Sequence, residues 1–256
     1  MDLSLFSLER RTAIVTGASR GLGKACALAL AGAGAEVVCT SRDLEALRKT
    51  AEAIEAKGSK ALALGADILS EESIENMVKQ AIDHFGKIDI LVNNAGLAKV
   101  TPVQFLDSAE WDLVLNTNLK GAFLTCKAIL PEMKKRSYGR IINMSSLGGL
   151  RGTKNLSAYD ASKAGLIKFS EALALEVVRY NITVNCICPG YILTDMNREF
   201  FKSKEGKAEL DRYPMKRPGD VSDIGGALIF LASDAASYVT ATTVIVDGAQ
   251  RWKGLF

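Results

Sequence analysis

Short apolar runs alternate with longer, partly polar stretches along the whole chain. Several runs are apolar at nearly every position, which is typical of strands that are covered on both faces of a sheet. At helical spacing, residues 43–57 and 70–85 carry their polar residues on one side, which predicts amphipathic helices. The apolar runs predict strands at residues 12–16, 36–40, 60–65, 88–92, 140–144, 183–188 and 242–246.

This order of elements predicts the fold. Strands that alternate with helices of this length form βαβ units, which build a parallel sheet. We therefore expect an α/β protein with a doubly wound parallel sheet of about seven strands and helices on both faces. No Pro/Gly/Ser-rich linker or internal repeat divides the chain, so residues 1–256 are expected to form a single domain. Residues 194–218 are the least regular stretch, and their polar, charged character predicts a variable flap over a site.

Composition and charge narrow the functional classes. The 256 residues are 48% hydrophobic and 24% charged, as in ordinary globular proteins. The net charge of +3 comes without a dense basic cluster, so binding to nucleic acid or a membrane surface is not expected. No stretch approaches the roughly 18 apolar residues of a membrane span, and residues 1–11 do not resemble a signal peptide. Five scattered cysteines without a Cys-x-x-Cys pair favour a reducing, cytoplasmic location.

The single histidine, His84, limits the available chemistry. A Ser-His-Asp or Cys-His mechanism would have to use this one ring, and zinc sites built on two or three histidines are excluded. We therefore predict no metal site.

A glycine-rich turn directly follows the first predicted strand. Gly17, Gly21 and Gly23 allow the backbone to turn tightly and to approach a ligand without clashes from a Cβ atom. The helical run at 24–31 would point its free N–H groups and its positive dipole end at that ligand. At the first strand-to-helix junction of a βαβ series, this predicts a pyrophosphate site in a Rossmann-type dinucleotide-binding domain. The residues expected there are Gly17, Ser19, Arg20, Gly21, Leu22 and Gly23.

The end of the second predicted strand bears on which dinucleotide binds. An NAD site usually places Asp or Glu there to hold the ribose hydroxyls. In this chain Ser41 occupies that place and Arg42 follows it, while Arg20 lies inside the glycine turn. Two guanidinium groups and a hydroxyl suit a 2′-phosphate, so NADP(H) is favoured over NAD(H). Asp43 comes one residue later and is expected to cap the next helix.

Tyr159 and Lys163 form the candidate acid–base pair. Residues at i and i+4 share one helical face, so the spacing predicts an ammonium group close to the phenol. A free tyrosine has a pKa of about 10, and a neighbouring cation lowers that pKa toward neutrality. The helix that carries the pair is expected to start at Tyr159 and to run to about Tyr180.

Five motifs in order resemble those of the short-chain dehydrogenase/reductase family. They are the glycine turn from Thr16 to Gly23, Asn93-Asn94-Ala95-Gly96, Ser146 thirteen residues before Tyr159, Tyr159-x-x-x-Lys163, and Pro189-Gly190. Together they cover essentially the whole chain. The resemblance implies an NAD(P)-dependent oxidoreductase that interconverts a ketone and a secondary alcohol by hydride transfer.

The resemblance also implies a role for each matching residue. Tyr159 would exchange a proton with the substrate oxygen, Ser146 would hydrogen-bond the same oxygen, and Lys163 would hold the nicotinamide ribose and lower the pKa of Tyr159. Asn118 would anchor a water that relays protons. The family's spacings favour Asn118 over Asn116 and Ser146 over Ser145. The other implied cofactor contacts are Asp67 and Ile68 at the adenine, Asn94 on the adenosine side, Ile192 and Thr194 at the nicotinamide amide, and also Pro189 and Gly190.

Two departures from the family pattern lie near the C-terminus. The family commonly has Val-Thr-Gly and Val-Asp-Gly-Gly there, whereas this chain has Ala241 and Ala249 in place of the last glycine of each motif. That end of the fold usually packs at a subunit interface in the family. The resemblance further implies a homotetramer or homodimer, built through the helix after Asn118 and the helix that carries Tyr159.

Substrate choice is expected to depend on residues 147–156, on Tyr191 and on the flap. A carboxylated or phosphopantetheine-bearing substrate could use the positive charge in these segments, and a solvated polar flap is the alternative. The cations concerned are Arg151, Lys154, Arg198 and Lys202.

Two groups within the family fit the chain about equally. It resembles 3-oxoacyl-carrier-protein reductases and gluconate 5-dehydrogenases, so the expected small-molecule substrate is a 3-oxoacyl thioester or a sugar acid such as a keto-gluconate. A non-enzymatic alternative is a redox sensor or scaffold that binds NADP(H) without turnover. Such proteins tend to lose the tyrosine or lysine, and this chain keeps both.

Overall fold

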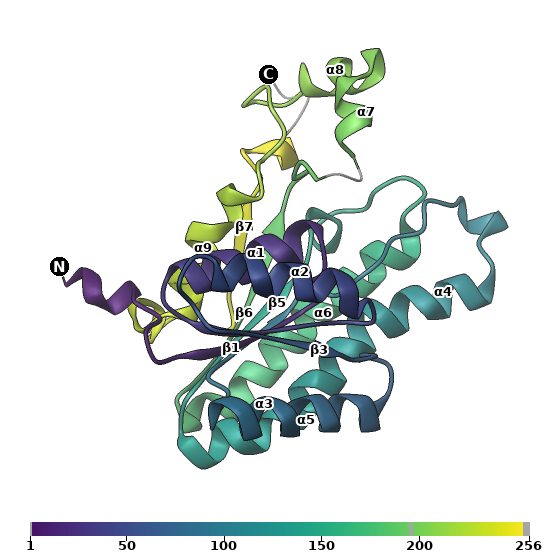
Figure 1. Cartoon of the computed structure of the whole chain (residues 1–256). Helices are drawn as coiled ribbons and strands as arrows, with labels where there is room; N and C mark the ends of the chain where they lie inside the picture. Colours follow the sequence, from purple (N-terminus) through teal and green to yellow (C-terminus); the bar gives the residue numbers. More distant parts are fainter. Residues whose placement is uncertain (1, 195–196, 253–256) are drawn as a thin grey trace.

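One parallel sheet forms the centre of the computed structural model, which describes residues 2–194 and 197–252 (Figure 1). Its seven strands lie in the order β3-β2-β1-β4-β5-β6-β7, and every neighbouring pair is parallel. The predicted α/β doubly wound sheet is confirmed, and the strand ends lie within two residues of the predicted ones. The strands are β1 (Thr12–Thr16), β2 (Glu36–Ser41), β3 (Ala61–Gly65), β4 (Ile90–Asn93), β5 (Gly139–Met144), β6 (Ile182–Pro189) and β7 (Thr243–Val246).

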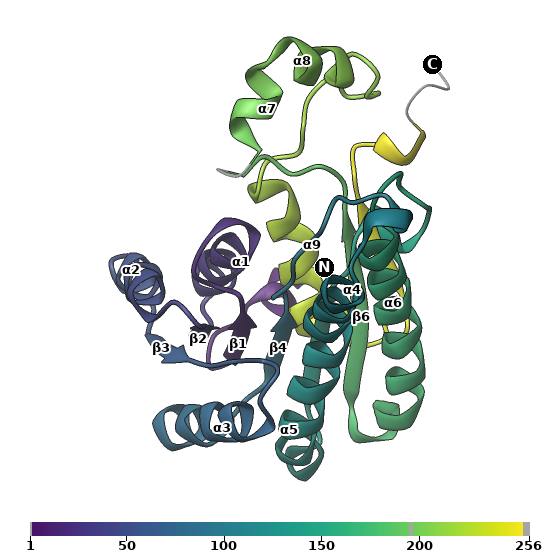
Figure 2. The same cartoon turned by 90° about the vertical axis from the view of Figure 1, so that its right-hand side faces the viewer.

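Helices cover both faces of the sheet (Figure 2). Successive strand residues point to opposite faces, so Val15 packs in the core on one side and Ile14 in the core on the other. This explains why β1 is buried at every position and why its sequence does not alternate. One face carries α1 (Gly21–Gly32), α2 (Leu44–Glu55) and α9 (Ser222–Ala232), and the other carries α3 (Glu71–Phe85), α5 (Gly121–Arg136) and α6 (Ser157–Val177).

Two helical features differ from the prediction near the expected site. Helix α6 begins at Ser157, so Tyr159 is its third residue and not its first, and a 3-10 turn (Val178–Tyr180) follows its end. Helix α4 (Ser108–Leu115) continues into α5 through a π-helical turn, Asn116–Lys120, which the hydrophobic pattern does not predict. None of the helices in the described ranges is long and apolar enough to cross a membrane.

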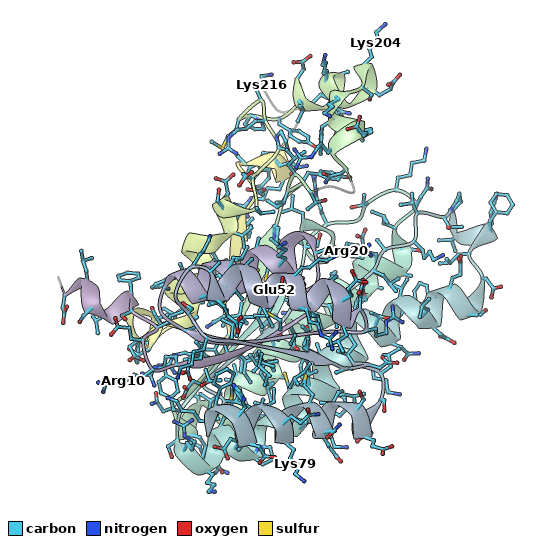
Figure 3. All side chains as sticks on the ribbon, in the orientation of Figure 1. Arg10, Arg20, Glu52, Lys79, Lys204 and Lys216 are labelled. Atoms are coloured by element: carbon cyan, nitrogen blue, oxygen red, sulfur yellow. The ribbon has the colours of Figure 1, made fainter. Side chains whose placement is uncertain are left out.

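The carboxyl ends of the strands meet at one edge of the sheet, and the strand order reverses direction between β1 and β4. Ligands of open parallel sheets bind at such a switch point. The flap rises above this edge and contains α7 (Arg198–Lys202) and α8 (Lys204–Leu210) (Figure 1). Asp195 and Met196, which belong to the predicted flap, lie outside the described residues. Figure 3 shows Lys204 and Lys216 projecting from the flap away from the sheet.

Candidate active site

The glycine turn has the backbone geometry that only glycine adopts readily. Gly17 and Gly21 have φ angles of 68° and 53°, in the left-handed region. A Cβ atom on Gly23 would lie 2.2 Å from the carbonyl oxygen of Gly17, so any side chain there would displace the turn. Helix α1 starts at Gly21, and the side chain of its N-cap residue, Arg20, makes no capping hydrogen bond. The first N–H groups of α1 therefore remain available to a ligand.

Asn94, the residue after β4, braces this turn. Its side-chain amide donates to the carbonyl oxygen of Thr16 at 3.0 Å, and the Thr16 hydroxyl accepts the N–H groups of Asn94 and Ala95, both at 3.0 Å. The amide of Asn94 thus faces the protein backbone. The Asn94 side chain therefore holds the shape of the glycine turn. Asn94 also borders the cleft that lies beside this turn.

A cleft of about 780 Å³ runs from this turn along the carboxyl edge of the sheet. Its size suits a drug-sized or larger ligand. Together with the glycine cradle and the helix N-terminus, it fits the pyrophosphate and one nucleoside of a dinucleotide. The predicted cofactor residues that line it are Gly17, Ser19, Arg20, Gly21, Leu22, Gly23, Ser41, Arg42, Asp67, Ile68, Asn94 and Thr194.

Other predicted cofactor residues lie elsewhere. Gly190 and Ile192 border a separate, smaller cavity of about 230 Å³ beneath the flap, and Pro189 is the buried last residue of β6. Tyr159 and Lys163 are not part of the lining of the large cleft. Several further residues line the large cleft, and among them the sequence motifs point only to Ala95 and Gly96 of the Asn-Asn-Ala-Gly motif. These residues are Ala66, Leu69, Ala95, Gly96, Leu97, Leu113 and Thr117.

The end of β2 forms the polar end of the cleft. The Ser41 hydroxyl accepts the N–H of Asp43 at 3.1 Å, and the Asp43 carboxylate accepts the N–H of Ala46 at 3.0 Å, which confirms the predicted helix cap. Arg20 and Arg42 are exposed, and neither forms an ion pair with a carboxylate in the part of the chain that the structure describes. Figure 3 shows Arg20 at the end of α1 that faces the cleft. Two unneutralised cations therefore border this end of the cleft.

Tyr159 and Ser146 approach each other beyond the cleft. The Ser146 hydroxyl accepts the N–H of Gly148 at 3.1 Å, at the start of a 3-10 turn. Burial raises the pKa of the Tyr159 phenol, a hydrogen bond with Ser146 opposes that rise, and the nearby Asp160 carboxylate adds to it. The pKa of Tyr159 therefore lies above its ordinary value. This differs from the expectation that Lys163 lowers it, because in this structure desolvation outweighs every other influence.

Lys163 is buried against the backbone of β5. Its ammonium group donates to the carbonyl oxygen of Met144 at 2.8 Å and lies 5.7 Å from the centre of the Tyr159 ring. Burial lowers the pKa of Lys163 to about 8. An ammonium group has three donors, so two remain after the bond to Met144. The neighbouring Ser145 hydroxyl donates to the Lys163 carbonyl oxygen at 2.9 Å and so braces the helix.

Asn118 clamps helix α6 to the loop after β4. It is buried in the π-helical turn, and its amide group donates to the carbonyl oxygen of Leu97 and to the hydroxyl of Ser162, both at 2.9 Å. Its side-chain oxygen accepts the N–H of Leu97 at 2.8 Å. Both N–H groups of the side chain are therefore used within the protein. A Cβ atom on Gly96 would lie 3.0 Å from the Asn118 oxygen, so this glycine leaves the space that the clamp needs.

Comparison with known proteins identifies the family. The family model described as short chain dehydrogenase matches residues 11–205, which include the glycine turn, Asn118, Ser146, Tyr159 and Lys163. The chain belongs to the short-chain dehydrogenase/reductase family. It is therefore an oxidoreductase, in agreement with the resemblance seen in the sequence.

Three relatives show how close the match is within this short-chain dehydrogenase/reductase family. The chain is 40% identical over 243 residues to a (2S)-[(R)-hydroxy(phenyl)methyl]succinyl-CoA dehydrogenase subunit of Thauera aromatica, with 95% of this chain and 97% of the relative covered. It is 41% identical over 242 residues to a 3-oxoacyl-[acyl-carrier-protein] reductase of Pseudomonas aeruginosa, with 94% and 98% covered. A solved structure assigned as a gluconate dehydrogenase of Agrobacterium tumefaciens superposes with a TM-score of 0.92 at 36% identity and covers 96% of this chain and 98% of its own.

Proposed function

We propose that this protein is an NADPH-dependent reductase that converts a ketone into a secondary alcohol on a 3-oxoacyl thioester. The observation that carries the cofactor preference is the pair of unneutralised cations, Arg20 and Arg42, beside Ser41 at the polar end of the cleft. A phosphate dianion would gain charge-assisted hydrogen bonds there, whereas a neutral ribose hydroxyl would gain little.

The residues of this chain have distinct parts in the proposed reaction. The bound nicotinamide would supply the hydride to the carbonyl carbon. Tyr159, whose raised pKa keeps it protonated at neutral pH, would donate its proton to the carbonyl oxygen, and Ser146 would hydrogen-bond that oxygen as charge develops on it. Lys163 would use its two free donors on the ribose. The Asn118 clamp would hold the helix that carries Tyr159 in place.

The thioester is favoured because two of the relatives act on acyl groups carried by coenzyme A or by a carrier protein. A keto-gluconate is the second candidate, supported by the structural similarity to a protein assigned as a gluconate dehydrogenase. We also propose a homotetramer or homodimer, because helices α5 and α6 expose Phe123 and Leu175 at 44% and 77%, and the 3-10 turn that follows α6 exposes Val178 at 50%. The five cysteines are buried and free, which supports a reducing, cytoplasmic location.

The cofactor proposal is tested by kcat/KM with NADPH and with NADH. We expect a preference for NADPH that Arg42→Ala reduces about tenfold or more, since one charge-assisted contact to a phosphate is lost. Arg48, an exposed residue of α2 that does not line the cleft, provides the matched control. A preference for NADH in the wild type, or an equal effect of Arg48→Ala, would contradict the proposal.

The proposed chemistry is tested by Tyr159→Phe. This variant should bind NADPH with unchanged affinity and reduce acetoacetyl-coenzyme A orders of magnitude more slowly. If the wild type binds NADPH but reduces neither acetoacetyl-coenzyme A nor 5-keto-gluconate, the sensor or scaffold alternative gains support. Analytical ultracentrifugation of the wild type tests the proposed assembly.

A further inference from the structure

The carboxylate of Asp160 contacts residues 147–153, the segment that follows Ser146. Asp160 lies in the first turn of α6. One of its oxygens, Oδ2, accepts the backbone N–H of Thr153. The other, Oδ1, lies against Gly148, where a Cβ atom would come within 2.1 Å of it. The carboxylate thus holds both ends of this segment against the start of α6.

Gly148 connects the segment to the Ser146 hydroxyl. The N–H of Gly148 donates to this hydroxyl at 3.1 Å, in the 3-10 turn Leu147–Gly149 that Ser146 caps. The Ser146 hydroxyl also hydrogen-bonds the Tyr159 phenol. A displacement of Gly148 would therefore move the hydroxyl relative to the phenol.

Stability alone does not explain the carboxylate of Asp160. Its Oδ1 atom is buried and has no hydrogen-bond partner within residues 2–194 and 197–252. Burial raises the pKa of this carboxyl group, and hydrogen bonds from Thr153 oppose the rise. A buried oxygen without a partner lowers the stability of a fold. The contacts that Asp160 makes with the segment after Ser146 therefore point to a functional role.

The charge of Asp160 also acts on Tyr159. It disfavours the phenolate and so helps to keep the pKa of Tyr159 above its ordinary value. The thiol of Cys188 and the phenol of Tyr191 act in the same direction, and the Lys163 ammonium group lies 5.7 Å from the centre of the Tyr159 ring. Burial is the largest cause of the raised pKa. A neutral side chain of the same shape in place of Asp160 would therefore leave Tyr159 protonated at neutral pH.

We propose that Asp160 is a positioning residue that holds the Ser146 hydroxyl beside the Tyr159 phenol by fixing residues 147–153 to the start of α6. The inference rests on the proposed reductase function and adds a residue on which its rate depends. Asp160 acts on the reacting carbonyl only through Ser146 and Tyr159, and it does not line the cofactor cleft. Its loss should therefore affect turnover more than the binding of NADPH.

Two substitutions of Asp160 separate its contacts from its charge. Asp160→Ala removes both, whereas Asp160→Asn keeps an oxygen that can accept the N–H of Thr153. With NADPH and acetoacetyl-coenzyme A at pH 7, we expect Asp160→Ala to lower kcat about tenfold or more, with KM within about threefold. Asp160→Asn should keep kcat within about threefold of the wild type, and equal losses in the two variants would refute the role of the contacts. Glu72→Ala, the control, removes an exposed carboxylate from the first turn of α3 and should change neither constant.

A substitution of Gly148 tests the same contact from the other side. Gly148→Ala would place a methyl group where Oδ1 of Asp160 lies, so it should lower kcat about tenfold or more. Without the Asp160 carboxylate, the nearest neighbour of that methyl group would be Cε1 of Tyr159 at 3.4 Å, an ordinary contact. Adding Gly148→Ala to Asp160→Ala should therefore lower kcat by less than about a further threefold. Losses that simply multiply in the double variant would contradict the proposal.

Hydrogen exchange separates the contacts of Asp160 from the reaction. Thr153 is exposed, so the protection of its amide depends on the bond to Asp160. Exchange at this amide should be about tenfold faster or more in Asp160→Ala and within about threefold of the wild type in Asp160→Asn. If the exchange changes in this way but the wild type reduces neither acetoacetyl-coenzyme A nor 5-keto-gluconate, the proposed function fails and the contacts stand. Unchanged exchange in Asp160→Ala, or faster exchange with unchanged kcat, would overturn the positioning role.

Discussion

Replacing Ala249 with glycine should stabilise the protein. Ala249 has a φ of 62°, in the left-handed region, at a position where the family commonly has glycine. A left-handed conformation costs a residue with a Cβ atom roughly 1–2 kcal/mol. Glycine avoids that cost but loses roughly 0.5–1 kcal/mol more chain entropy on folding. Because Ala249 is exposed, its methyl group contributes little burial, and the net gain is about 0.5–1 kcal/mol.

The gain should be measurable as a shift in thermal and chemical unfolding. For a chain of this size it corresponds to a rise in Tm of about 1–3 °C, and the urea midpoint should rise with an unchanged m value. Ala241, with a φ of 56°, gives a second case. Its methyl group packs against the core beside α5 and α6, so Ala241→Gly should gain less than Ala249→Gly.

Ala53, inside helix α2, provides a control of opposite sign. Ala53→Gly should lower the stability by about 1 kcal/mol, since glycine is a poor helix former. If Ala249→Gly also lowered the stability by a similar amount, the argument from the left-handed backbone would be refuted.

Three further predictions concern the glycine turn, Lys163 and Arg140. Gly23→Ala should weaken NADPH binding at least tenfold in a fluorescence titration, because its Cβ atom would collide with the Gly17 carbonyl; unchanged affinity would show that the turn can yield. Burial lowers the pKa of Lys163 to about 8, so its ammonium group is charged below that pH and neutral above it. Therefore kcat/KM for ketone reduction should fall up to tenfold per pH unit above about pH 8. A profile that stays level to pH 10 would contradict this. Arg140 is fully buried, and its guanidinium group donates hydrogen bonds to Asp234, Gly139 and Asn181. Arg140→Met should therefore lower the free energy of unfolding, measured in urea, by about 3 kcal/mol. A decrease of less than about 1 kcal/mol would refute the structural role of Arg140.

The parts of the fold that follow local rules could be predicted from the sequence. Runs of apolar residues identify the strands because both faces of the sheet are covered, and Asp43 identifies a helix start because its side chain caps the helix it precedes. The glycine turn is recognisable because its spacing follows from backbone geometry that few other residues can adopt.

Features set by tertiary contacts could not be predicted in this way. The direction of the Tyr159 pKa depends on how deeply the folded chain buries the phenol, and spacing to Lys163 does not reveal that. The flap appears polar in sequence, yet Phe201 and Tyr213 pack on Tyr191 at ring distances of 6.1 and 6.4 Å and so fasten it to the site. The contact between Arg151 and Arg251 joins residues one hundred positions apart, which no local pattern indicates.

The π-helical turn at Asn116–Lys120 makes this protein unusually sensitive to the length of its chain at one place. A turn with i to i+5 hydrogen bonds holds one residue more than an α-helical turn. Deletion of a single residue there would let α4 and α5 fuse into a regular α-helix. Asn118 would then rotate by about 100° about the helix axis, away from Leu97 and Ser162. A frame-preserving loss of one codon would thus give a protein that still folds but in which Asn118 no longer holds helix α6 in place. Length variation should therefore be found in the flap and not in this turn.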